Sequence, residues 1–171
     1  MKVLVTGEIG SGKSTAVRAA MAELGWTAPA GFFTHWKGAG RGAPTLYLET
    51  WDGVCRAIAR RTAVPAAPGG LGYELDEPVF TRAALESLAG AGPGRPVVLD
   101  ELGRIELGAL AFIGRVAELF RGSAPVLAVI QRRALGAWRE RLGEAAFQNL
   151  LEVDSATRDG LPRRMASVFG G

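Results

Sequence analysis

The sequence is poor in cysteine and histidine. Cys55 is the single cysteine and His35 the single histidine among 171 residues. One cysteine cannot form an internal disulfide, which is typical of proteins from a reducing compartment. One histidine cannot by itself form a metal site or a serine–histidine pair. We interpret Cys55 as a small buried side chain and His35 as a residue near the end of a strand.

Long apolar runs and a strong charge of one sign are also missing. No apolar run reaches the ~20 residues of a membrane span, and the first apolar stretch, MKVLVTG, reads as a short strand rather than a signal peptide. The formal net charge is +3, which is too small to indicate a nucleic-acid partner but suits a polyanionic ligand. We expect a cytoplasmic monomer without a membrane or nucleic-acid partner, and leave a protein partner open.

What the sequence does contain is an alternation of buried strands and helices. Apolar and β-branched runs predict strands at residues 3–5, 31–36, 96–101, 125–130 and 150–153. Helical spacing predicts helices at residues 14–24 and 81–88, along a stripe from Leu107 to Phe120, and from Leu161 onward. Two strand-like runs around Asp52-Gly53 predict an antiparallel hairpin. Residues 1–171 are therefore expected to form one α/β domain with a mostly parallel sheet and helices on both faces.

The strongest motif lies between the first strand and the first helix. The segment Gly7-Glu-Ile-Gly-Ser-Gly-Lys-Ser14 matches G-x-x-x-x-G-K-[ST], the phosphate-binding loop or P-loop. The glycines Gly7, Gly10 and Gly12 allow a tight turn that presents backbone N–H groups to phosphate oxygens. The predicted nucleotide-binding residues are Gly7, Glu8, Ile9, Gly10, Ser11, Gly12, Lys13, Ser14 and Thr15. The fold predicted by this motif is the three-layer sandwich of the P-loop NTPases.

Within this loop the side chains have separate predicted tasks. Lys13 can reach the β- and γ-phosphates, and the Ser14 hydroxyl can bind Mg²⁺. The positive end of the following helix favours the same anion. Thr15 is a candidate contact for the α-phosphate.

A second motif follows the strand at residues 96–101. This apolar strand ends in Asp100 and Glu101, as in a Walker B segment. Ligands of such sheets bind beyond the carboxyl ends of the strands. Asp100 is the predicted second Mg²⁺ ligand with Ser14, and Glu101 is the predicted base that polarises the attacking water.

The surroundings of these carboxylates resemble one family. The segment Leu99-Asp-Glu-Leu-Gly-Arg-Ile-Glu-Leu107 is similar to the signature of the small cancer-related nucleoside-triphosphatase family, in which an Asp-Glu-Ile-Gly-Lys-Met-Glu-like segment follows the Walker B strand. Other segments resemble the family in the same order, so that the resemblance covers nearly the whole chain. They are Gly31-Phe-Phe-Thr34, Arg41-Gly42, the stretch from Tyr73 to Phe80, the strand from Val126 to Arg132, and Thr157-Arg158-Asp159.

The resemblance implies slow, Mg²⁺-dependent hydrolysis of several nucleoside triphosphates. It carries over Asp100 as a metal ligand, Glu101 as the water-activating residue and Arg104 as a cation near the site, so that Lys13, Glu101 and Arg104 are the predicted catalytic residues. It also implies that Arg158 lies by the base. The chain departs from the family at His35, where the family has an acidic residue, in the charge-poor loop at residues 37–44, and at Thr157, where the family has Asn.

Several assignments stay open from the sequence. Arg104, Arg132 and Arg133 are alternative candidates for an arginine finger that stabilises charge on the γ-phosphate. Trp36, Trp51 and Trp138 are interpreted as packing residues rather than base-stacking ones. A nucleotide or small-molecule kinase, or a nucleotide-dependent switch, are the alternatives to a nucleoside-triphosphatase. A kinase lid is typically an arginine-dense insert, and none lies between the last two predicted strands, although Arg132, Arg133, Arg139 and Arg141 make a partial case.

Overall fold

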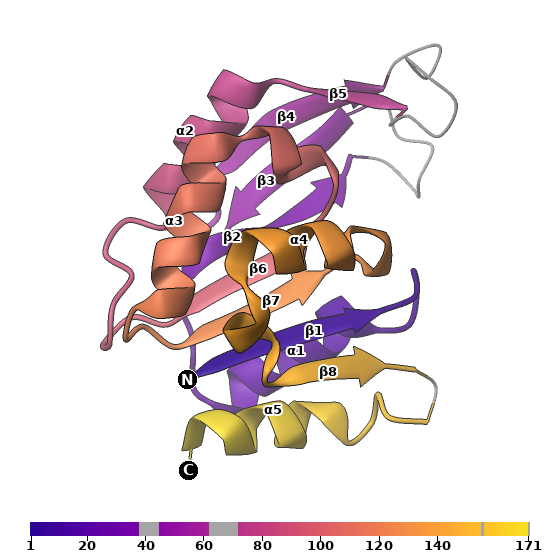
Figure 1. Cartoon of the computed structure of the whole chain (residues 1–171), viewed down its shortest axis with the longest axis vertical. Coiled ribbons are helices and arrows are strands. Elements are labelled where there is room, and N and C mark those ends of the chain that lie inside the picture. Colours follow the sequence, from indigo (N-terminus) through magenta and orange to yellow (C-terminus); the bar gives the residue numbers. More distant parts are fainter. Residues whose placement is uncertain (38–44, 62–71, 155, 171) are drawn as a thin grey trace.

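An eight-stranded sheet organises the molecule. A computed structural model describes residues 1–37, 45–61, 72–154 and 156–170. The spatial order of the strands is β5-β4-β3-β2-β6-β7-β1-β8 (Figure 1). The strands are β1 (Lys2–Gly7), β2 (Ala30–Trp36), β3 (Thr45–Thr50), β4 (Cys55–Arg61), β5 (Tyr73–Leu75), β6 (Val97–Leu102), β7 (Val126–Ile130) and β8 (Leu150–Val153).

The sheet has a parallel part and an antiparallel part. The pairs of β2 with β6, β6 with β7, β7 with β1 and β1 with β8 are parallel. The pairs of β2 with β3, β3 with β4 and β4 with β5 are antiparallel. The predicted hairpin is thus confirmed as β3 and β4, and β5, which the sequence did not predict, adds a further edge strand.

Helices cover both faces of this sheet. They are α1 (Lys13–Glu23), α2 (Glu77–Ser87), α3 (Leu110–Arg121), α4 (Leu135–Leu142) and α5 (Leu161–Gly170). Helices α2, α3 and α4 lie on one face in Figure 1, with their core centred on Phe32, Phe80 and Phe112. Helices α1 and α5 pack on the other face through residues such as Val17 and Met165. The predicted three-layer α/β architecture is confirmed.

Some helix boundaries differ from the prediction. Helix α2 begins at Glu77 rather than at residue 81, because the Asp76 carboxylate accepts a hydrogen bond from the Val79 N–H and caps a first turn that contains a proline. The predicted stripe from Leu107 to Phe120 is divided between a 3₁₀ turn at Ile105–Gly108 and α3, and Leu110 is exposed.

Two predicted loops, at residues 37–44 and 65–72, lie almost entirely outside the described residues, and so do Arg41 and Gly42. Within the described part of the chain, no helix has the length and apolar character required to cross a membrane.

Candidate nucleotide-binding site

The phosphate-binding loop connects the carboxyl end of β1 to the first turn of α1. Gly12 precedes the helix with φ +96° and ψ 15°, a left-handed conformation that disfavours any residue with a Cβ. The first turn of α1 contains no acidic residue. Its free N–H groups and the positive end of the helix dipole therefore remain available to an anion.

Lys13 lies across this loop. Its side chain is 7% exposed, and Nζ donates to the backbone carbonyls of Gly7 at 3.2 Å and Glu8 at 2.8 Å. Carbonyl acceptors neutralise less charge than phosphate oxygens do. The ammonium is thus already positioned at the loop and can exchange these carbonyls for a phosphate.

Asp100 meets the loop at the carboxyl end of β6. The Ser14 hydroxyl donates to Asp100 Oδ1 at 3.1 Å, which joins the loop to the Walker B strand. Burial raises the pKa of Asp100 from 3.8 to about 6; the Ser14 hydrogen bond and the charges of Arg18 and Lys13 oppose this rise, whereas the charge of Glu101 adds to it. A buried carboxylate of this kind is stabilised by an added cation.

The Ser14 hydroxyl and the Asp100 carboxylate are oxygen donors of the kind that Mg²⁺ takes beside substrate phosphates. They lie within 3.1 Å of each other at one end of a cavity, and the Asp100 side chain is almost fully buried. The donor set therefore fits a magnesium ion.

Glu101 follows Asp100 and is fixed by a residue that the sequence analysis missed. Gln131 Nε2 donates to Glu101 Oε1 at 2.6 Å, and the Gln131 N–H donates to the Leu102 carbonyl. Gln131 is the first residue after β7, the strand beside β6. The position of Gln131 directly after a buried parallel strand could have indicated a site residue. Only the next two residues, Arg132 and Arg133, were predicted to lie there.

Glu106 is the second residue whose role the sequence did not suggest. It is 2% exposed, and its Oε2 accepts the Gly103 N–H at 2.8 Å. Burial raises the pKa of Glu106 from 4.5 to about 7. Trp138 Nε1 donates to the Gly103 carbonyl at 2.9 Å. Both the N–H and the carbonyl of Gly103 are therefore hydrogen-bonded to side chains, which fixes the turn after β6.

These groups surround one cavity of about 560 Å³. The P-loop forms one wall, and β2, β3 and the end of β6 supply the others. Its lining includes Lys13, Ser14, Thr34, Trp36, Asp100, Glu101, Arg104, Glu106 and Gln131. A second cavity of about 420 Å³ shares Gly12 and Thr15 with it and is also lined by Arg158, Asp159 and Pro162. The two cavities therefore adjoin at the P-loop.

Comparison with known proteins identifies the family of the chain. A family model described as NTPase matches residues 2–166. The chain belongs to this NTPase family. The predicted nucleoside-triphosphatase family is therefore confirmed, and with it the prediction of an enzyme of this type.

Two relatives of this NTPase-family chain are proteins named nucleoside-triphosphatase THEP1. This chain is 26% identical over 170 residues to the THEP1 of Natranaerobius thermophilus, covering 96% of this chain and 93% of that protein. It is 36% identical over 73 residues to the THEP1 of Methanosarcina barkeri, covering 43% and 41% of the two chains.

Solved structures share the fold of this NTPase-family chain. The crystal structure of THEP1 from Aquifex aeolicus superposes with a TM-score of 0.80 at 23% identity, covering 98% of both chains. The solution structure of a human cancer-related nucleoside triphosphatase superposes with a TM-score of 0.73 at 24% identity, covering 98% of this chain and 96% of that one.

The three candidate arginines of this NTPase-family chain are placed differently. Arg104 lines the larger cavity. Arg132 is paired with Glu8 of the P-loop at 3.3 Å and also with Glu152. Arg133 is exposed. Among the described residues, Arg104 is the one of the three that lines the cavity of Asp100 and Glu101 and has no carboxylate partner.

The three tryptophans predicted to be packing residues lie in different environments, and Cys55 differs from its prediction. Trp138 is fully buried, and Trp51 packs on Phe33 while its Nε1 donates to a β6 carbonyl at 3.0 Å. Trp36 packs on Tyr73 at 4.3 Å between centroids and also lines the larger cavity. The interpretation of Cys55 as buried is wrong: it is exposed, because the face of β4 that carries it turns away from the core.

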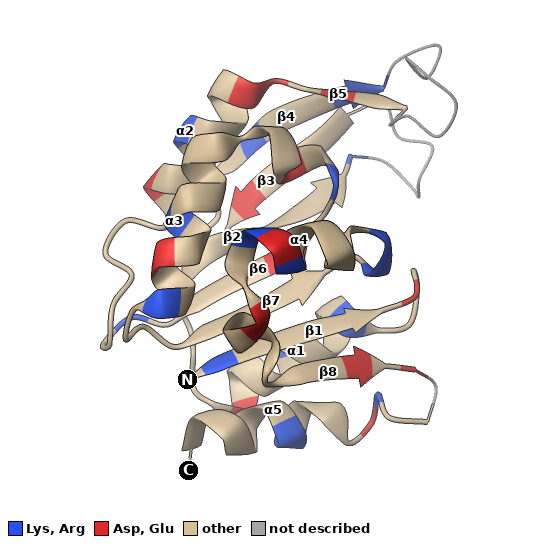
Figure 2. Cartoon of the chain, in the orientation of Figure 1, with Lys and Arg blue, Asp and Glu red and all other residues tan. Residues whose placement is uncertain are grey.

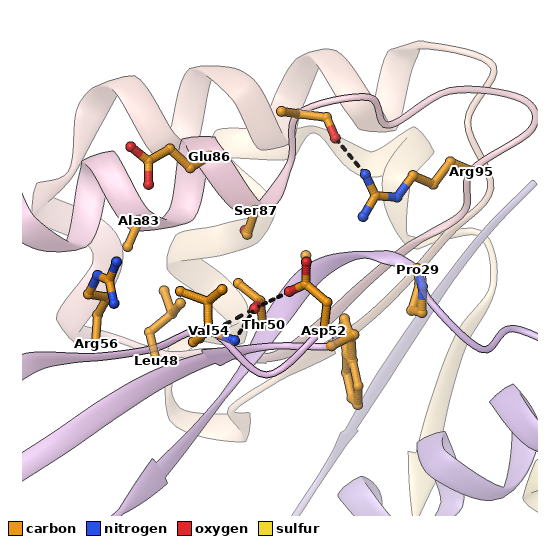
Figure 3. A pocket seen from close by; sticks show the side chains of 13 residues that line it. Pro29, Leu48, Thr50, Asp52, Val54, Arg56, Ala83, Glu86, Ser87 and Arg95 are labelled. Atoms are coloured by element: carbon orange, nitrogen blue, oxygen red, sulfur yellow. Dashed lines mark hydrogen bonds between the residues drawn. The ribbon is translucent and has the colours of Figure 1, made fainter.

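A further cavity of about 190 Å³ lies at the opposite end of β2 from the P-loop (Figure 3). Figure 3 shows Arg56 and Arg95 at its two ends, with Asp52 and Glu86 between them. Arg95 is bound to the backbone carbonyls of Ala28 and Ala89. This cavity shares no lining residue with the larger cavity at the P-loop.

Proposed function

We propose that the protein hydrolyses nucleoside triphosphates to diphosphate and phosphate, with Mg²⁺, in the cavity at the P-loop. One observation carries the proposal: Lys13, Ser14, Asp100 and Glu101 line the same cavity, and Ser14 is hydrogen-bonded to Asp100. Phosphoryl transfer depends mainly on positioning and on charge stabilisation. These four side chains supply both.

Binding begins with the loop. The N–H groups of the P-loop and the start of α1 receive the phosphates, and Lys13 Nζ leaves the Gly7 and Glu8 carbonyls for the β- and γ-phosphates. Ser14 and Asp100 would hold the magnesium ion, which neutralises phosphate charge when bound. Arg104 lines the same cavity and adds a positive charge there.

Water activation falls to Glu101. Its carboxylate accepts a proton from water, and the water oxygen attacks the γ-phosphorus while the β-phosphate oxygen leaves. Gln131 positions the Glu101 carboxylate through the 2.6 Å hydrogen bond. Because Gln131 holds Oε1, Oε2 is the oxygen left to accept the proton of the water.

The base is proposed to lie in the smaller cavity beside Arg158. The planar guanidinium of Arg158 can stack on any base. Arg158 and Asp159, which pair with each other at 3.5 Å, are the charged lining side chains that could read a base edge, and they are 57% and 91% exposed. Hydrogen bonds to such exposed groups compete with water and discriminate weakly. Loose base selectivity is therefore part of the proposal.

The test is steady-state phosphate release from the purified protein with ATP, GTP, CTP and UTP, each with Mg²⁺ and with a chelator. We expect slow release from several triphosphates that requires Mg²⁺. Lys13→Ala is expected to abolish release, because it removes the charge on the β- and γ-phosphates. Arg121→Ala, which changes an exposed cation at the end of α3 and outside both cavities, is the matched control and is expected to keep activity.

Two outcomes would count against the proposal. Nucleotide binding by the wild type without release above the Lys13→Ala level would favour a kinase that lacks its acceptor or a switch that lacks its partner. Release from a single triphosphate would contradict loose base selectivity while leaving hydrolysis in place.

A further inference from the structure

Three possible metal ligands converge on the hairpin, away from the P-loop cavity. Among the described residues, His35, Glu49 and Cys55 each offer one ligand atom, and these atoms lie within 4.8 Å of one another. His35 Nε2 and Glu49 Oε2 are already in contact at 2.9 Å. The three residues come from β2, β3 and β4.

The strand register explains the convergence. Glu49 is paired with Phe33 on β2 and with Cys55 on β4, so that Glu49 and Cys55 project from the same face. His35 is two residues beyond Phe33 and shares that face. It is a diagonal neighbour of Glu49, within reach of long side chains. Residues of the alternate set, such as Leu48 and Ile58, point to the other face and into the core.

The surroundings orient the imidazole. The His35 ring stacks on Tyr47 with 5.9 Å between centroids and an 18° interplanar angle, and it lies 5.8 Å from the Phe33 ring. The side chains of His35 and Glu49 are 39% and 32% exposed, and Cys55 is exposed. The set is thus held in place on one side and open to an ion from solvent on the other.

From this arrangement we propose that His35, Glu49 and Cys55 form a binding site for Zn²⁺ or a similar transition-metal ion. Thiolate, imidazole and carboxylate are the ligands that zinc takes, with a water in the fourth position. A tetrahedral zinc ion with bonds of about 2.0–2.3 Å holds its ligands roughly 3.3–3.8 Å apart. The widest spacing, at most 4.8 Å, must therefore shorten by about 1 Å, and the 2.9 Å contact between His35 and Glu49 must open by about 0.4 Å. Side-chain rotation of Cys55, which is exposed, and of the partly exposed His35 and Glu49 permits both changes.

The ligand chemistry separates this site from the one at the P-loop. Ser14 and Asp100 offer oxygen alone, which suits Mg²⁺, whereas Cys55 and His35 offer softer donors that Mg²⁺ does not take. On binding, the Cys55 thiol loses its proton to solvent and the sulfur donates an electron pair to the metal. The ion would cross-link β2, β3 and β4, whose opposite face carries Thr34, Trp36 and Leu46 into the nucleotide cavity.

The experiment is a titration of the untagged, reduced chain with Co²⁺ in excess Mg²⁺, followed by the charge-transfer absorption of a cobalt–thiolate bond. Because Cys55 is the single cysteine, this band reports on one sulfur. We expect saturation at one Co²⁺ per chain and loss of the band on addition of Zn²⁺. Zn²⁺ is also expected to raise the melting temperature.

The variants separate a three-ligand site from a lone thiol. Cys55→Ser should lose the band and the thermal shift. His35→Gln and Glu49→Gln should each weaken Co²⁺ binding at least about tenfold, since loss of even an outer partner of a metal ligand costs about 10- to 100-fold. Glu74→Gln, at an exposed position on β5, should bind as the wild type does. Absence of the band in the wild type, or binding unchanged in both His35→Gln and Glu49→Gln, would overturn the proposal.

Discussion

Glu106 makes the pH dependence of folding a direct test of the structure. The carboxyl is fully enclosed, and burial raises its pKa from 4.5 to about 7. Between these values the unfolded chain ionises Glu106 while the folded chain keeps it protonated. Folding then takes up a proton, so the free energy of unfolding falls as the pH rises through this window.

The perturbation that isolates this effect is Glu106→Gln. Glutamine keeps an oxygen that can accept the Gly103 N–H and does not ionise. A rise in pKa from 4.5 to about 7 corresponds to about 3 kcal/mol. The variant is therefore expected to gain about 3 kcal/mol relative to the wild type between about pH 4 and about pH 8. Asp100, whose pKa is also raised, is present in both proteins and cancels in the difference.

The assay is urea unfolding of both proteins across this pH range, compared as the difference in unfolding free energy. Glu140→Gln, at an exposed position of α4, serves as the control for the substitution itself. If the unfolding free energies of the wild type and Glu106→Gln changed in parallel with pH, the folded chain would ionise Glu106 as readily as the unfolded chain does. That result would contradict the raised pKa of Glu106.

Three further predictions concern the hydrophobic core, the close approach of β2 to β6 at Gly31, and Asp100 as the proposed Mg²⁺ ligand. Phe80→Ala should lower the unfolding free energy by about 3–5 kcal/mol in urea, because the ring is fully buried between two other phenylalanines; a loss below about 1 kcal/mol would contradict this packing. Gly31→Ala should cost more than about 2 kcal/mol, since its Cβ would lie 2.2 Å from the Val98 carbonyl oxygen, and wild-type stability would refute that contact. Asp100→Asn should weaken Mg²⁺–nucleotide binding by calorimetry at least about tenfold, or 1.4 kcal/mol, with little change in a chelator; equal loss in both conditions would speak against a metal role.

The charge distribution bears on partners. Basic and acidic positions alternate along α3 and α4 rather than gathering by sign (Figure 2). A nucleic-acid footprint would gather Lys and Arg on one face or helix. The expectation that the protein has no nucleic-acid partner remains a prediction.

The parallel part of the fold could be read from the sequence because its signals are local. The apolar runs of β1, β6 and β7 have almost no exposed side chains, so each gives an uninterrupted hydrophobic segment. β5 gave no such signal, since its three residues are partly exposed and pair only with the edge of β4. The start of α2 at Glu77 was missed, although Pro78 lies in its first turn, where proline is compatible with a helix.

The candidate site was predictable where a motif fixes both residue and spacing. The P-loop and the Asp100-Glu101 pair are of this kind, and the structure brings Ser14 and Asp100 together. The Gln131 bond to Glu101 depends on which strand lies next to β6, a tertiary fact that residue spacing alone does not contain. The exposure of Cys55 depends likewise on the register of β4.

If Glu101 activates water at the P-loop, Glu101→Gln should release phosphate far more slowly than the wild type. The variant should bind nucleotide as the wild type does, with kcat lower by about 10²- to 10⁴-fold, the usual contribution of a general base. Nucleotide affinity and kcat are measured together, so that loss of binding is not mistaken for loss of the base. A variant that binds nucleotide and releases phosphate at the wild-type rate would contradict the account.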